Sequence, residues 1–130
     1  MSRYLTTADL IHINVRMAQR WGGTSGVRDL GLLESAVARP QNGYYADVLE
    51  QAAALCESLL QNHPFLDGNK RSAVVATAVF LRWDGYKLQF SDRDMYDWLM
   101  ALYDQKCVNR QELDRWLRTH AVETSLHCAI

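Results

Sequence analysis

A run of nine residues at positions 63–71, HPFLDGNKR, gathers side chains that can move a proton, hold a metal ion and bind an anion. Histidine titrates near neutral pH, so His63 can accept the proton of an attacking hydroxyl group. The carboxylate of Asp67 is a hard oxygen ligand of the kind that Mg²⁺ prefers. Lys70 and Arg71 place two cations within one helical turn, which suits a bound di- or triphosphate. The run therefore predicts phosphate chemistry.

The backbone of this run adds to the same prediction. Gly68 and Asn69 lie where a helix is predicted to begin, and a helix start offers unpaired N–H groups and partial positive charge to an anion. Gly68 has no side chain, so the backbone can approach a ligand closely. Cations at Lys70 and Arg71 oppose the helix dipole, so helix stability alone does not explain them. This mismatch favours anion binding.

Several of these residues also have a purely structural interpretation. His63 continues the apolar face of the helix before it, where a lone histidine is more often a core or capping group. Asp67 can serve as a helix N-cap, and Gly68 and Asn69 are ordinary turn formers. Phe65 is predicted to anchor the loop in the core and is assigned no chemistry.

The composition describes an ordinary globular domain. With 130 residues the chain predicts a single domain over 1–130, with an irregular tail from about residue 121. The net charge of −1 argues against nucleic acid as a main partner. Neither an apolar run of about 18 residues nor a secretory start is visible, which predicts a cytoplasmic protein without a membrane partner. The cysteines, an odd number without C-x-x-C spacing, predict neither disulfides nor a zinc site.

Helical spacing of apolar residues predicts six helices. They follow Thr6, Asp29, Asp47, the turn at 67–69, Ser91 and Asn109. The stretch 72–81 is apolar on every side and fits either a buried helix or a buried strand. We predict a helix, because the stretch continues to about Trp83, holds three alanines and has no obvious partner strands. This helix is expected at the centre of the fold.

The fold class predicted is therefore all-α, a compact six-helix bundle around a buried central helix, with a small β-hairpin flap. The flap is placed at Asn42-Gly43, because Asn-Gly accommodates the positive φ angles of a type I′ turn, and a plain surface turn is the alternative. The tryptophans lie at or near apolar stripes and are predicted to pack in the core; they are Trp21, Trp83, Trp98 and Trp116.

The segment 63–71 resembles the motif of the Fic/Doc superfamily, His-x-Phe-x-Asp/Glu-Gly/Ala-Asn-Gly/Lys-Arg, and matches each of its fixed positions. Two further segments are similar to the family. Residues 26–40 resemble the segment before its flap, and residues 80–85 resemble the end of its central helix. The resemblance covers roughly residues 4–118.

Within the superfamily, Lys70 is typical of the Doc (death on curing) toxins, whereas Fic enzymes, which typically transfer AMP, usually have glycine there. Many Fic motifs also place a second arginine where this chain has Val74. The resemblance thus implies a Doc-like kinase toxin of a type II toxin-antitoxin system. It would use Mg²⁺ and ATP, or another nucleoside triphosphate, to phosphorylate a hydroxyl of a translation factor such as elongation factor Tu. Gly68 follows the Fic form instead, so an AMP transferase is the alternative.

The resemblance also assigns roles by position. They are His63 as the base, Asp67 as the Mg²⁺ ligand or orienting carboxylate, Gly68 and Asn69 as the anion hole, and Lys70 and Arg71 as the phosphate clamp. The inhibitory signature of self-restrained Fic proteins, Ser/Thr-x-x-x-Glu-Gly/Asn, is absent from the sequence. We therefore expect restraint by a separate antitoxin. A catalytically idle module that binds an antitoxin is the third interpretation.

Overall fold

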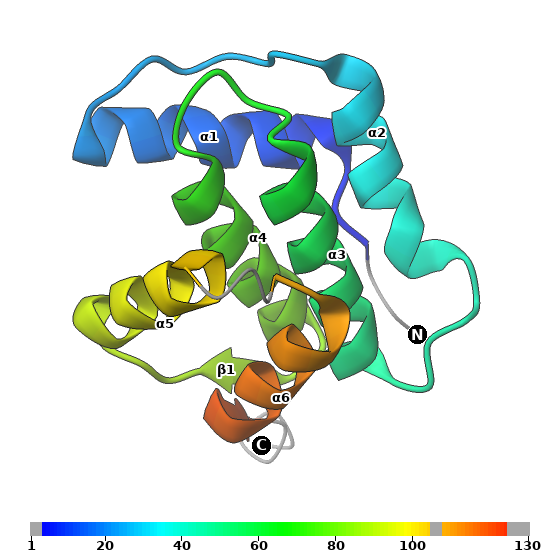
Figure 1. The fold of residues 1–130 in the computed structure, drawn as a ribbon. Helices are drawn as coiled ribbons and strands as arrows, with labels where there is room; N and C mark the ends of the chain where they lie inside the picture. The colour runs from blue at the N-terminus through cyan, green and yellow to red at the C-terminus, as the bar shows by residue number, and fades with distance from the viewer. Residues whose placement is uncertain (1–3, 105–107, 125–130) are drawn as a thin grey trace.

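A computed structural model describes residues 4–104 and 108–124. These stretches form α1 (Thr7–Trp21), α2 (Leu30–Ala38), the 3-10 helix η1 (Arg39–Gln41), α3 (Val48–Asn62), α4 (Asn69–Trp83), β1 (Tyr86–Leu88), α5 (Asp92–Asp104), α6 (Arg110–His120) and β2 (Ala121–Glu123) (Figure 1). The predicted six-helix fold is confirmed. Of the helices in the described stretches, none has the length and apolar character needed to cross a bilayer.

The polar residues that the sequence predicted as helix N-caps begin four of the helices. The Asp9 amide donates to Thr6 Oγ1 at 3.1 Å, and the Thr6 amide donates to Asp9 Oδ2 at 2.9 Å, which completes a capping box before α1. Asp29, Asp47 and Asn109 cap α2, α3 and α6 in the same way, each accepting from an amide three residues later. Local side-chain chemistry therefore fixes these boundaries.

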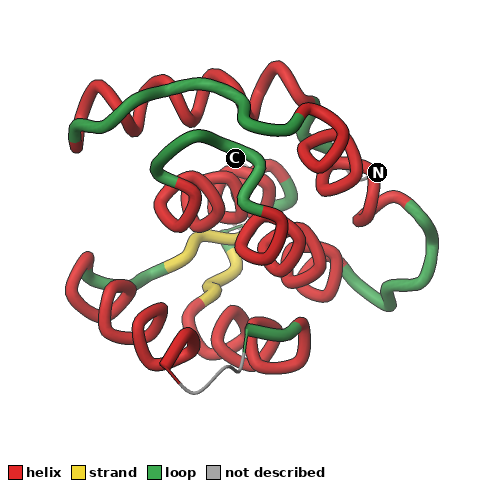
Figure 2. The backbone as a smooth tube through the Cα atoms, turned by 45° about the horizontal axis from the view of Figure 1, so that its top comes forward, coloured by secondary structure: helices red, strands yellow, loops and turns green. Residues whose placement is uncertain are grey.

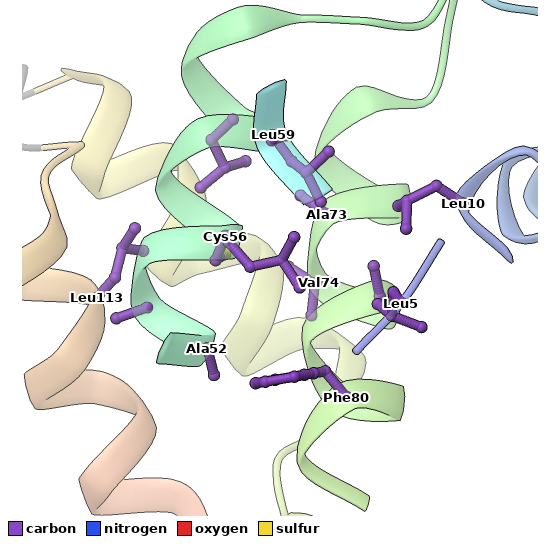
Figure 3. Close-up of a cluster of buried hydrophobic side chains, with 14 of the residues drawn as sticks. Leu5, Leu10, Ala52, Cys56, Leu59, Ala73, Val74, Phe80 and Leu113 are labelled. Atoms are coloured by element: carbon purple, nitrogen blue, oxygen red, sulfur yellow. The ribbon is translucent and has the colours of Figure 1, made fainter. Parts of the chain in front are cut away.

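The core lies between α3 and α4, which pack side by side, while α1 crosses α4 on its other side (Figure 1). Ala52 and Ala53 of α3 and Ala73 and Ala76 of α4 are fully buried, and such small side chains let two helices approach closely. Figure 3 shows apolar side chains of both helices meeting, among them Cys56 and Phe80. The predicted buried central helix is therefore α4.

A small antiparallel sheet closes the other end of the bundle. β1 pairs with β2 in the register Lys87 opposite Val122, and Figure 2 shows the two strands side by side. This pair supplies the small β element that the sequence predicted, but at another place in the chain. β2 also includes residues 121–123, which were predicted as irregular tail. Residues 125–130 of that tail lie outside the described residues.

The prediction of a hairpin at Asn42-Gly43 is wrong. Asn42 has φ −85°, whereas a type I′ turn requires positive φ at both central residues. The reason is local. Pro40 lies in the first turn of η1, which continues directly from α2, and the Asn42 amide donates to the Arg39 carbonyl at the end of this 3-10 turn. The segment is therefore a turn without strands on either side, which was the alternative.

The prediction of core packing is wrong for one tryptophan. Trp98 and Trp116 stack with ring centroids 4.2 Å apart, and Trp83 packs against the core. Trp21 is instead 46% exposed, because it is the last residue of α1 and the chain turns away at Gly22. Its ring is covered by the guanidinium group of Arg71, 4.7 Å from the ring centroid.

Candidate active site

Residues 63–68 form the loop between α3 and α4, and both of its ends have left-handed backbone conformations. His63 ends α3 with φ 48°, and Gly68 precedes α4 with φ 72°. Between them Phe65 is buried, with 1% of its surface exposed, which confirms the predicted core anchor. The side-chain amide of Asn69 donates to the Phe65 carbonyl at 3.0 Å and accepts from the Phe65 amide at 2.9 Å. These contacts hold the loop in one shape.

A second segment, residues 22–29 between α1 and α2, runs beside this loop (Figure 1). Val27 and Phe65 form an isolated antiparallel bridge, and the Leu66 amide donates to the Gly26 carbonyl at 3.0 Å. No strand pattern is visible here in the sequence, because the pairing is a single bridge between residues 38 positions apart. The glycine-rich run GGTSG at 22–26 is the local feature that indicates an irregular segment.

The side chain of Asn14 in α1 forms hydrogen bonds with both segments. It is 2% exposed, its Nδ2 donates to the Asp67 carbonyl at 3.0 Å and to Ser72 Oγ at 3.2 Å, and its Oδ1 accepts from the Gly26 amide at 3.0 Å. Sequence reasoning missed this residue. A signal existed, because Asn14 lies four residues after Leu10 within the apolar stripe of α1.

Three predicted site residues come together in a cavity of about 200 Å³. Asp67, Gly68 and Arg71 line it from the loop and the first turn of α4, and Trp21 and Gly23 line it from the opposite side. Arg71 reaches the cavity with its guanidinium group resting on the Trp21 ring. The cavity therefore combines a carboxylate, a cation and the backbone at a helix start.

The start of α4 keeps its first-turn amides uncapped by any described side chain. Asp67, the alternative N-cap, accepts at Oδ1 from the neighbouring Gly68 amide at 2.8 Å instead. A Cβ atom at Gly23 would overlap Asp67 Oδ2, so the carboxylate rests directly against the backbone of that glycine. The amides of Asn69, Lys70 and Arg71 are thus the donors that an anion would meet.

His63 and Lys70 lie outside the lining of this cavity. The side chain of His63 is exposed, so the core interpretation of this histidine does not apply. Lys70 Nζ lies 4.7 Å from the ring centroid of Tyr103 in α5, whereas Arg71 turns toward α1. The two predicted clamp residues therefore approach the helix start from different sides.

The cavity has one carboxylate, Asp67, that could contribute to the binding of a metal ion. The described residues contain no group of three or more histidine, cysteine, aspartate or glutamate side chains that could hold an ion by themselves. Mg²⁺ is commonly bound through one or two carboxylates together with substrate phosphates. Asp67 is one carboxylate beside an uncapped helix start, which fits Mg²⁺ that is bound together with substrate phosphates.

The model of the Fic/DOC family matches residues 4–81 of the chain, which include the whole of the loop between α3 and α4. The chain belongs to this family. It is 41% identical over 93 residues to Toxin Doc of Mycolicibacterium smegmatis, covering 68% of this chain and 69% of that protein. It is 29% identical over 90 residues to Protein kinase doc of Escherichia phage P1, covering 66% of this chain and 71% of that one. The predicted resemblance to the Doc toxins is confirmed.

Proposed function

We propose that the protein is a Doc-like toxin kinase that transfers a phosphoryl group from a nucleoside triphosphate such as ATP to a hydroxyl group of a target protein. One observation carries the proposal: Asp67, Gly68 and Arg71 line a single cavity at the uncapped start of α4. The names of the two relatives, a toxin and a protein kinase, support the same reading.

The polyphosphate of the donor would lie on the first turn of α4. The amides there donate to phosphate oxygens, and the helix dipole adds favourable potential for a negative charge. Arg71 would offer paired N–H donors from the side of Trp21. Lys70 would offer a compact positive charge from the side of Tyr103. Asp67 would hold Mg²⁺, which supplies charge neutralisation between the phosphates when it is bound.

His63 would act as the general base at the edge of this site. It takes the proton from the target hydroxyl, whose oxygen forms a bond to the γ-phosphorus while the bond from that phosphorus to the β-phosphate oxygen breaks. The products are a phosphorylated hydroxyl group and a nucleoside diphosphate. Phosphoryl transfer depends mainly on positioning and charge stabilisation, and both are properties of the fixed loop and helix start.

AMP transfer is the second candidate, and Gly68 favours it because this residue follows the Fic form of the motif. In that reaction the target oxygen attacks the α-phosphorus and pyrophosphate leaves. The position of the second Fic arginine favours the kinase instead, since Val74 there is 3% exposed and lies in the core. The described part of α4 therefore offers no further cation three residues after Arg71.

The proposal extends to the partners of the protein. Its restraint would come from a separate antitoxin, which the toxin named among its relatives supports. The target is a translation factor of the cytoplasm, for which elongation factor Tu is the first candidate. Both follow from the likeness to the Doc toxins.

The proposal is tested with purified protein, bacterial translation factors and ATP labelled at either the γ- or the α-phosphate. We expect label from the γ-phosphate in a protein target, loss of this transfer in His63→Ala, and unchanged transfer in the matched control His12→Ala. His12 is exposed on α1 and serves as the second histidine. Label only from the α-phosphate would support AMP transfer, and unchanged transfer in His63→Ala would refute both reactions.

A further inference from the structure

The C-terminus of α3 has a conformation that its sequence makes unfavourable. Among the described residues, His63 is the single non-glycine residue with positive φ, and the Cβ atom makes this conformation costly. Helices that end on a left-handed residue are commonly closed by a main-chain bond from the residue after it. That residue is Pro64, which has no N–H group. The last carbonyls of α3 therefore need donors from elsewhere.

Arg28, from the segment beside the loop, supplies these donors. Its Nε donates to the His63 carbonyl at 2.7 Å, and its Nη2 donates to the Asn62 carbonyl at 2.7 Å. Its own backbone amide donates to the Pro64 carbonyl, also at 2.7 Å. One residue thus binds three consecutive carbonyls, and its positive charge sits at the end of α3 where the helix dipole favours a cation.

We propose that Arg28 is a positioning residue that holds the backbone of His63 left-handed and thereby fixes the direction in which the loop presents the imidazole. The inference rests on the proposed function, in which His63 is the base. Arg28 acts through His63 rather than on the donor, because the edge of its guanidinium group formed by Nε and Nη2 is engaged by the two carbonyls. It is also absent from the residues that line the cavity.

The chemistry of the guanidinium group explains why arginine occupies this position. A planar fork with fixed donor directions can hold two neighbouring carbonyls in one geometry. Lysine would keep the charge at the end of α3 but not the geometry. Tyr103 makes a useful contrast, because its hydroxyl donates to the Leu60 carbonyl at 3.2 Å and so supports α3 without touching the His63 peptide.

The test compares Arg28→Ala and Arg28→Lys with Arg115→Ala in the full chain. Arg115 is an exposed arginine of α6 that pairs with Glu112 within its own helix, so this control removes a comparable charge. We expect both Arg28 variants to lower kcat, by up to about 100-fold, with KM for ATP little changed, because a misplaced base slows the transfer without weakening donor binding. Added guanidinium ion should restore part of kcat in Arg28→Ala.

The double variant Arg28→Ala/His63→Ala separates positioning from general stability. If Arg28 acts through His63, the double variant is no slower than His63→Ala alone. A further loss in the double variant would overturn the inference. Wild-type kcat in Arg28→Ala, found together with an inactive His63→Ala, would also overturn the inference. That result would leave the proposed function intact. Wild-type transfer in His63→Ala would instead refute the proposed function.

NMR spectroscopy of His63 tests the positioning role of Arg28 without any measurement of catalysis. The imidazole resonances of His63, assigned by comparison with His63→Gln, report the surroundings of the ring. We expect them to shift in Arg28→Ala and Arg28→Lys and to stay unchanged in Arg115→Ala. Unchanged His63 resonances in folded Arg28→Ala would contradict the proposed positioning, whether or not the protein transfers phosphate.

Discussion

Gly23 offers a sharp test of the site, because a methyl group there collides with one carboxylate. Gly23 has φ +98°, and an added Cβ atom would overlap Asp67 Oδ2 and lie 3.2 Å from its Cγ. In Gly23→Ala the Asp67 side chain must therefore rotate away. This rotation breaks its 2.8 Å hydrogen bond with the Gly68 amide and moves the carboxylate from the cavity.

The loss of stability in Gly23→Ala can be compared with that in Gly43→Ala. Both variants have backbone strain, but the Gly43 variant has no steric overlap. Gly43 has φ +86°, and an added Cβ atom there meets no heavy atom within 4 Å. A non-glycine residue in such a conformation costs about 1–3 kcal/mol. The broken hydrogen bond in Gly23→Ala adds about 1 kcal/mol. The free energy of unfolding should therefore fall by about 1–3 kcal/mol in Gly43→Ala and about 2–4 kcal/mol in Gly23→Ala.

Urea denaturation measures these two free energies, and phosphoryl transfer is then measured under conditions where both variants are folded. We expect Gly23→Ala to lose about 10–100-fold in kcat/KM, the loss typical when the surroundings of a metal ligand are disturbed. Gly43→Ala should keep transfer at the wild-type level. Wild-type transfer in folded Gly23→Ala, together with loss of transfer in Asp67→Ala, would refute the packing of this carboxylate against Gly23.

Three further predictions concern the stability and reactivity of the fold. Asn14→Leu leaves the Asp67 carbonyl without its buried donor and should lower the free energy of unfolding by about 1–3 kcal/mol in urea denaturation; an unchanged value would contradict the bridging role. Partial burial alone would raise the pKa of Asp47, but the amide at the start of α3 and the Arg118 guanidinium hold it below its ordinary value. The contribution of this pair is therefore present at neutral pH and lost as the pH falls below about 4, so Asp47→Asn should be up to about 1 kcal/mol less stable than the wild type at pH 7 and equal to it in acid. Burial raises the pKa of the Cys56 thiol to about 11, so peptide mass mapping at pH 8 should find it alkylated by iodoacetamide only after denaturation; labelling in the native protein would contradict its burial.

The sequence could predict most of the fold because its signals were local. The capping residues Thr6, Asp29, Asp47 and Asn109 each act within three positions of themselves, so their helix starts needed no tertiary information. The apolar stretch 72–81 was also decided locally, by its length and alanine content. The prediction of a hairpin at Asn42 failed because a neighbouring proline favoured another turn.

The candidate site could be predicted in its residues but less well in its geometry. All six predicted residues belong to one run, yet the partners that hold them come from far along the chain, as Asn14 and Arg28 do. No local pattern identifies the partners in such contacts, although the place of Asn14 in the apolar stripe of α1 indicates that it is buried. One feature was within reach: consecutive helical residues project about 100° apart, so Lys70 and Arg71 belong on different sides of α4. Trp21 was misjudged because the end of a helix is less covered than its middle.

The mass of the modified target shows whether the protein is a kinase that uses His63 as its base. Elongation factor Tu is incubated with Mg²⁺, ATP and either the wild-type protein or His63→Ala, and its intact mass is then measured. We expect the wild-type protein to add one phosphoryl group and His63→Ala to leave the mass unchanged. An added adenylyl group would rule out the kinase reaction, and an equal phosphoryl gain with His63→Ala would rule out His63 as the base.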